Sequence, residues 1–163
     1  MQQSMKRCFA SISLLWLVAM VMMAQQSSDP YVIQLEEAQD KIEYQMAIQF
    51  KNAMVSGILV LKRDEEGNMR GAMMNEFGIS GMNFIVSGDR CKVSLVSVMP
   101  KMNKWYIRKV IKGDLKYLFS STRSHLGQDY KKRRIELSDG GEIILKNLKY
   151  HHSYQIRSLN EQQ

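Results

Sequence analysis

The residues of this 163-residue chain best suited to chemistry are three histidines, two cysteines and one run of four cations. His151 and His152 are adjacent, so in a strand their side chains point to opposite faces and cannot chelate together. No serine lies in a Gly-x-Ser-x-Gly turn, and no glycine-rich stretch has the spacing of a phosphate loop. We therefore predict no catalytic residue, no metal site and no cofactor. An enzyme whose site gathers distant residues, His125 among them, remains a third hypothesis.

The two cysteines predict no disulfide. Cys8 precedes the apolar N-terminal run instead of following it, so we do not expect a lipid on it. Only Cys91 would remain after removal of that run, which excludes an internal disulfide. Cys91 lies in the strand-like stretch "RCKVSLVSV", which predicts a small buried thiol.

The strongest charge feature is the run Lys131, Lys132, Arg133 and Arg134, in a chain of net charge +7. Taken alone, such a run is also typical of a nuclear signal or a nucleic-acid patch. The export signal described next argues against nucleic acid as a partner. We predict that the four residues bind an anionic lipid head group. Two alternatives stay open: an acidic glycan, and a strand edge protected by charge.

The N-terminus has the design of a secretory signal. Lys6 and Arg7 precede sixteen mostly apolar residues that end at Ala24, and a polar segment follows. This predicts a signal peptide over residues 1–24 with cleavage near Ala24. An uncleaved membrane anchor is the alternative, although about 20 apolar residues are needed to span a bilayer. We expect residues 25–163 to form a single periplasmic or secreted domain.

Alternating hydrophobicity predicts strands over most of that domain. From Ile42 to Phe50 apolar and polar residues alternate, as in a half-buried strand. Two hairpins follow, with turns at 64–68 and 87–90, and a third turns at 139–141 before a last strand. The stretch between Pro30 and Lys41 is compatible with a short helix.

Residues 101–120 change to a helical period with one apolar stripe and a basic outer face. Gly113 inside this segment weakens a helix by about 1 kcal/mol relative to alanine. The predicted fold is mainly β (α+β). It is a curved antiparallel sheet or half-open β-barrel of about eight strands, with an amphipathic helix inserted after the fifth.

Several predicted strands are apolar on both faces. Ile58 and Val60 lie on one face of their strand, and Leu59 and Leu61 lie on the other. An antiparallel sheet with one wet face needs one cover, whereas this sheet needs two. The helix supplies one cover. Sheet curvature, a partner protein or an apolar ligand supplies the other.

The order of these elements, together with the segment "NEFGISGMNF", resembles the LolA/LolB-like lipoprotein carriers of Gram-negative envelopes. In that family an unclosed barrel holds acyl chains in an apolar cavity covered by a helix. The resemblance extends over about residues 42–145. Gly78 is the one residue that can be set against the Pro-Leu-Gly turn of the LolB-like members. The chain lacks their lipidated N-terminal cysteine.

We therefore predict a non-enzymatic exported domain that binds an apolar ligand, a lipid or lipoprotein acyl chain, with peripheral membrane contact. The alternative is an envelope protein–protein interaction module. The candidate cavity residues are Ile48, Phe50, Val60, Phe77, Phe84 and Trp105.

Overall fold

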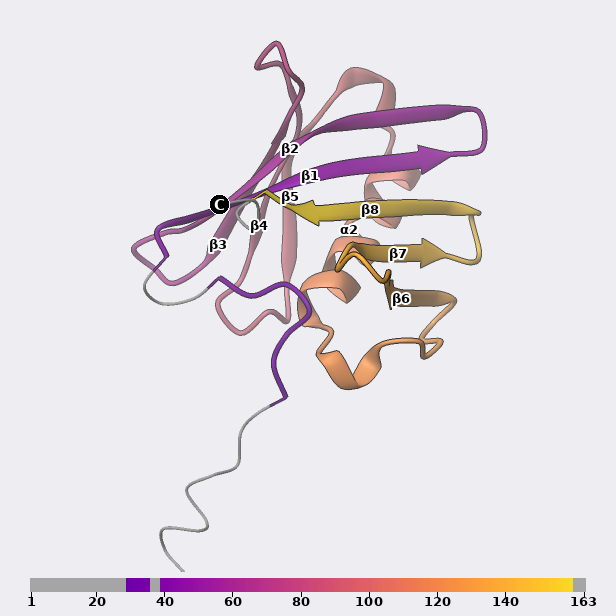
Figure 1. Cartoon of the computed structure of the whole chain (residues 1–163). Helices are drawn as coiled ribbons and strands as arrows, with labels where there is room; N and C mark the ends of the chain where they lie inside the picture. The colour runs from indigo at the N-terminus through magenta and orange to yellow at the C-terminus, as the bar shows by residue number, and fades with distance from the viewer. Residues whose placement is uncertain (1–28, 36–38, 160–163) are drawn as a thin grey trace, which may run out of the picture.

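The computed structural model describes residues 29–35 and 39–159. It contains an eight-stranded antiparallel sheet with a long helix against one face (Figure 1). The predicted signal peptide, with its cleavage point at Ala24, lies outside the described residues. No helix within the described ranges is long and apolar enough to cross a membrane.

Eleven elements make up the described chain. The strands are β1 (Lys41–Phe50), β2 (Ala53–Arg63), β3 (Met69–Met74), β4 (Ser80–Val86), β5 (Val93–Val98), β6 (Arg133–Leu137), β7 (Ile143–Asn147) and β8 (His152–Ser158). The helical segments are η1 (Pro100–Met102), α2 (Trp105–Ser120) and η2 (Arg123–His125).

The order of the strands across the sheet is β5-β4-β3-β2-β1-β8-β7-β6. Strands β1 to β5 form the predicted meander, because each pairs with the next. The C-terminal strand β8 returns to pair with β1, so that Met46 lies opposite Ile156. The sheet therefore ends in two edge strands, β5 and β6, which do not pair with each other in the described sheet.

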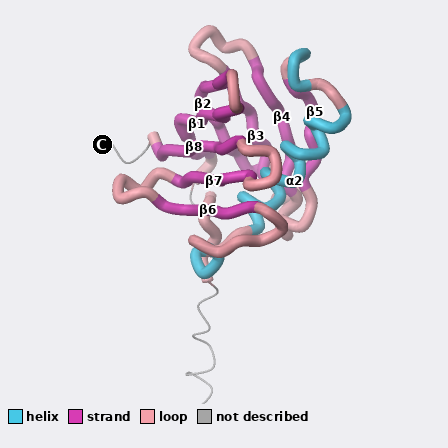
Figure 2. The backbone as a smooth tube through the Cα atoms, turned by 90° about the vertical axis from the view of Figure 1, so that its right-hand side faces the viewer, coloured by secondary structure: helices cyan, strands magenta, loops and turns pink. Residues whose placement is uncertain are grey.

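The sheet curls around α2, which contacts β5 near one edge and β6 and β7 near the other (Figure 2). This arrangement confirms the predicted fold class: a mainly β chain with a curved antiparallel sheet and a helix after the fifth strand. The described sheet is not closed into a barrel, and α2 contacts strands near both of its edges.

The concave face of the sheet and one side of α2 form the core. Alternate residues of β1 are buried, as the sequence pattern predicts for a strand with one covered face. The buried apolar residues of the two layers include Ile42, Tyr44, Met46, Ile48, Leu59, Leu61, Ile111, Leu115, Leu118 and Phe119. Burial of each such side chain contributes about 1.5–3 kcal/mol to folding.

One glycine in the sheet makes room for an aromatic contact between the two layers. Phe84 packs on Phe119 of α2 with ring centroids 5.5 Å apart. The Phe84 ring lies over its strand partner Gly71, where an added Cβ would come within 2.2 Å of the ring. A side chain at Gly71 would therefore displace Phe84 from the core.

The described residues between Pro30 and Lys41 form no helix, so the prediction of a helix there is wrong for this part. They run along the end of α2, where the Val32 amide donates to the Ser121 carbonyl. Ile33 is fully buried, and the Arg90 guanidinium donates to its carbonyl at 2.6 Å. Burial of Ile33 and backbone bonds to a neighbouring segment replace the local bonds that a helix would have made.

Cys91 lies in the turn between β4 and β5 and is exposed. The prediction of a buried thiol is therefore wrong. Its amide donates to the Asp89 carboxylate at 3.0 Å, which ends the turn before β5 begins at Val93. The strand-like run is thus two residues shorter than its composition indicates.

Candidate ligand groove and buried carboxylate cluster

Asp114 of α2 is fully buried and accepts four side-chain hydrogen bonds. Oδ1 accepts from Arg133 Nε at 2.6 Å and from Asn147 Nδ2 at 2.7 Å. Oδ2 lies 2.8 Å from His152 Nε2 and accepts from the Tyr154 hydroxyl at 3.0 Å. We call these five residues the Asp114 cluster. The cluster joins the helix to β6, β7 and β8. Its hydrogen bonds also offset the cost of burying the Asp114 carboxylate.

The cluster explains the glycine in the middle of α2. A Cβ on Gly113 would lie 2.7 Å from Nη2 of Arg133. The guanidinium therefore passes directly over the Gly113 backbone on its way to Asp114. Gly113 weakens the isolated helix, but it gives Arg133 access to the carboxylate.

All members of the Asp114 cluster except Arg133 are buried, and the Arg133 side chain is 18% exposed. Asp114 and Tyr154 are fully buried, and His152 is 8% exposed. Burial raises the pKa of the Tyr154 hydroxyl well above its usual value of 10.0, and the adjacent Asp114 charge raises it further. A substrate cannot reach these groups, so the cluster is a structural tie that includes a histidine and a tyrosine. Within the described ranges no group of three or more acidic, cysteine or histidine side chains could hold a metal ion.

The six predicted cavity residues do not surround one pocket. Ile48 and Phe84 are buried in the core, and Phe50 and Val60 are half-buried on opposite faces of the sheet. Phe77 and Trp105 are 78% and 76% exposed. Among the six, Trp105 lines a pocket large enough for a ligand.

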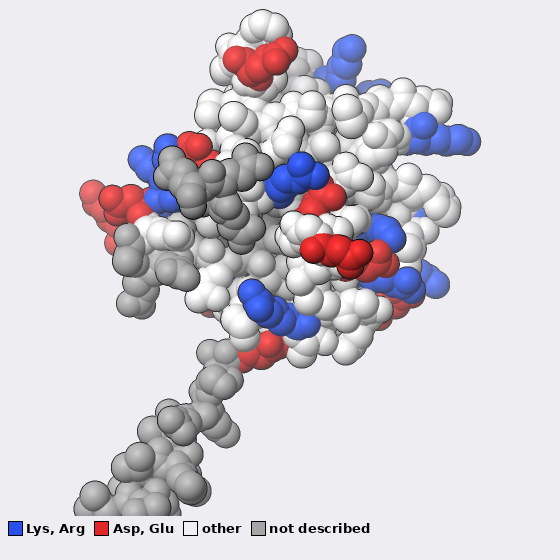
Figure 3. Space-filling view, viewed as in Figure 1, with Lys and Arg blue, Asp and Glu red and all other residues white. Residues whose placement is uncertain are grey.

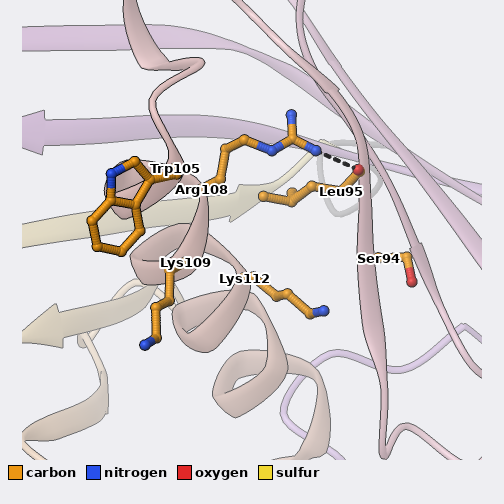
Figure 4. Close-up of a pocket in the computed structure, with 6 residues that line it drawn as sticks. All are labelled: Ser94, Leu95, Trp105, Arg108, Lys109 and Lys112. Carbon is orange, nitrogen blue, oxygen red and sulfur yellow. Dashed lines mark hydrogen bonds between the residues drawn. The ribbon is translucent and has the colours of Figure 1, made fainter.

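That pocket is an open groove of about 420 Å³ between β5 and the first half of α2. Its lining residues are Ser94, Leu95, Trp105, Arg108, Lys109 and Lys112. Figure 4 shows Arg108 and Lys112 extending from the helix toward β5, while Trp105 and Lys109 project on its other side in this view. The lining contains three cations and no carboxylate, so it favours an anion.

The helix period places the groove residues together. Trp105, Arg108, Lys109 and Lys112 are spaced i, i+3, i+4 and i+7, so they occupy one arc of the helix surface, with Arg108 and Lys112 on the side nearer β5 and Trp105 and Lys109 farther from it. Arg108 also ties the helix to the edge strand, because Nη2 donates to the Leu95 carbonyl at 2.8 Å. This spacing is present in the sequence, which predicts a basic outer face for the helix, but no sequence pattern indicates that β5 lies beside that face.

The four residues of the basic run 131–134 have different surroundings in the structure: the two arginines form ion pairs, and the two lysines form none among the described residues. Arg133 enters the Asp114 cluster, and Arg134 donates to Asp129 at 2.6 Å. Lys131 and Lys132 are exposed and form no ion pair within the described chain. On the face shown in Figure 3, basic and acidic side chains lie side by side, so charge there is mixed in sign.

A second, smaller pocket of about 270 Å³ lies on the convex face over β1, β2 and β8. Its lining is polar and includes Gln45, Glu142, Gln155 and Arg157. Glu142 and Arg157 are 3.7 Å apart, so the two charges offset each other and leave little to attract a charged ligand.

Comparison with protein-family models finds no match to this chain, and comparison with curated protein sequences finds none either.

Proposed function

We propose that the protein is a non-enzymatic module that binds an anionic amphiphile, such as a fatty acid or an acidic lipid, in the groove between β5 and α2. The observation that carries the proposal is the lining of that groove. Trp105 and Leu95 offer apolar surface, and Arg108, Lys109 and Lys112 offer positive charge without a competing carboxylate. A hydrocarbon chain gains about 0.8 kcal/mol for each CH₂ group that it buries.

The proposal modifies the hypothesis made from sequence. The interior that would have formed an acyl cavity is filled by core side chains, Ile48 and Phe84 among them. The ligand therefore lies at the mouth of the open barrel, where edge strand and helix separate. We also propose that the protein acts outside the cytoplasm, on the basis of the signal-like pattern that ends at Ala24.

Titration with dodecanoate, followed by tryptophan fluorescence, tests the proposal. Trp16 also fluoresces, so the variant Trp105→Phe identifies the groove signal. We expect dodecanoate to shift the Trp105 emission and dodecanol to bind more weakly. The double variant Lys109→Ser/Lys112→Ser should lose about fivefold to tenfold in affinity for dodecanoate, as expected for two exposed charges.

A matched control removes two lysines outside the groove, in the variant Lys62→Ser/Lys116→Ser. Both residues are exposed, and neither lines the pocket. We expect this variant to bind dodecanoate as the parent protein does. Equal losses in the two double variants, or no emission change with either ligand, would contradict the proposal.

The convex face of the sheet favours a second function, that of a protein-interaction module. Ile58 and Val96 are 41% and 61% exposed on strands β2 and β5. Val60 lies two residues from Ile58 on β2, whereas Met74 and Ile85 lie on β3 and β4, and all three are half-buried. A stable complex that is lost in Ile58→Lys, while dodecanoate binding is retained, would favour this function over ligand binding.

A further inference from the structure

Two adjacent turns at the β6–β8 side of the sheet present the same combination of side chains. The first turn joins Tyr130 to Arg133, and the second joins β7 to β8 through Leu148–His151. The Leu148 amide donates to the Lys132 carbonyl at 2.8 Å, which holds the turns together. Figure 2 shows β6, β7 and β8 side by side next to α2. We call the exposed residues Tyr130, Lys131, Lys132, Lys149, Tyr150 and His151 the two-turn patch.

Each turn pairs a tyrosine with a lysine. The ammonium of Lys131 lies 5.0 Å from the centroid of the Tyr130 ring, and that of Lys149 lies 5.0 Å from the Tyr150 ring. Both tyrosines are 51% exposed. Lysine and tyrosine side chains share one physical property, an apolar body with a polar tip.

Three patch residues hold the left-handed backbone that non-glycine residues rarely adopt. Lys131 and Lys132 have φ angles of 47° and 62°, and His151 has a φ of 53°. Tyr130 and Arg133 exchange both backbone hydrogen bonds, and φ is positive at both central residues, as in a type I′ turn. Such turns favour Asn-Gly, whereas this one carries two lysines. The chain thus keeps two charged residues where smaller ones would be less strained.

Both turns are anchored in the Asp114 cluster. Arg133 ends the first turn and bonds Asp114 through Nε. Asn147 precedes the second turn and bonds Asp114 through Nδ2, while its Oδ1 accepts from the amides of Lys149 and Tyr150. The buried carboxylate therefore fixes the position of an exposed basic surface.

We propose that the two-turn patch docks the protein on an anionic lipid bilayer. Lys131, Lys132 and Lys149 form no ion pair within the described residues, so their charges are available to lipid phosphates. Exposed tyrosines beside lysines fit the boundary between head groups and acyl chains.

The ring contacts of Tyr130 favour a bilayer over a nucleic acid or a glycan. Both of those ligands are commonly bound by stacking on open aromatic faces. The Tyr130 ring is stacked on Tyr117 at 5.7 Å and also has the Lys131 ammonium over it. It therefore offers little open face to a base or a sugar, although its hydroxyl edge can still reach a head group.

Co-sedimentation of the full chain with lipid vesicles tests the docking proposal. The vesicles are pure phosphatidylcholine, or phosphatidylcholine with three parts in ten of phosphatidylglycerol. The readout is the ratio of binding to the anionic and neutral vesicles, because the apolar N-terminal stretch partitions into both. We expect this ratio to fall about thirtyfold in Lys131→Asn/Lys132→Gly, since one lysine near an anionic surface contributes about fivefold.

The control variant Lys62→Ser/Lys92→Ser removes two exposed lysines at the other end of the strands and should leave the ratio unchanged. A gadolinium-labelled head group gives a local readout, because it should broaden the amide resonances of 130–132 and 148–151 and not those of 64–68. Broadening elsewhere, equal losses in both variants, or binding to heparin or nucleic acid with none to vesicles would overturn the proposal. The outcome does not depend on whether the groove binds dodecanoate.

Discussion

Arg133 reaches Asp114 across the backbone of Gly113, and its Nε lies 2.6 Å from the carboxylate oxygen Oδ1. The pair connects the centre of α2 to the first residue of β6, an edge strand of the open sheet. Strand β6 has one strand neighbour, so its position depends on contacts with the helix. The ion pair between Arg133 and Asp114 is one of these contacts, and a hydrogen bond between charged groups is stronger than one between neutral groups.

The substitution Gly113→Ala tests whether the helix propensity of residue 113 or its packing against Arg133 has the larger effect on stability. In an exposed helix the change would raise the free energy of unfolding by about 1 kcal/mol. Here the new methyl would meet Nη2 of Arg133 at 2.7 Å and push the guanidinium away from Asp114. We expect a net loss of about 1–2 kcal/mol by urea unfolding. Lys112→Ala, exposed on the same helix, is the control and should change stability by less than about 0.5 kcal/mol. A gain in stability for Gly113→Ala would show that Arg133 is not held against the helix.

Asp114→Ala should be among the most destabilising substitutions in the chain. It leaves the largely buried Arg133 charge without its partner and removes the acceptor of Asn147 and Tyr154. Loss of one member of a buried pair costs about 3–5 kcal/mol. Asp139→Ala, at an exposed turn, should cost far less. Equal unfolding midpoints in urea for the two variants would rule out the Asp114 cluster as a structural tie.

The decrease in the free energy of unfolding at alkaline pH should depend on Tyr154. Its pKa is raised in the folded protein by burial and by the Asp114 charge. Above about pH 10 the unfolded chain therefore loses the Tyr154 proton while the folded chain retains it, so stability falls as pH rises. Tyr154→Phe should be less stable than the parent at neutral pH, but it should lose less stability between pH 9 and 11. Parallel urea-unfolding profiles across that range would refute this assignment.

The fold was predictable because its signals are local. The alternation from Ile42 to Phe50 predicts β1, the Asp-Gly-Gly sequence at 139–141 predicts the β6–β7 hairpin, and the change of period after Pro100 predicts α2. The described residues between Pro30 and Lys41 were misassigned because burial of Ile33 and Leu35 overrides their helix propensity.

The candidate sites were harder to predict because their partners are distant in sequence. Asp114 meets Arg133 across 19 positions and Tyr154 across 40. The basic run 131–134 therefore contains both a half-buried arginine, Arg133, and two exposed lysines, and the sequence alone does not distinguish them. The groove spacing on α2 was visible, but the position of β5 opposite it depends on how far the sheet curls.

The turn Tyr130–Arg133 should gain stability from a substitution that removes its charges. Lys131 and Lys132 both hold positive φ angles, which cost roughly 1–2 kcal/mol for each ordinary residue. Lys131→Asn/Lys132→Gly supplies the residues that a type I′ turn favours, so we expect the free energy of unfolding to rise by about 1–2 kcal/mol. Lys62→Ser/Lys92→Ser removes the same charge without altering a left-handed residue and should leave stability nearly unchanged. Thermal and urea unfolding of the three proteins would measure both effects. A more stable variant that docks less well would indicate that the strained lysines are retained for function, whereas an equal or lower stability would show that the turn is relaxed as it stands.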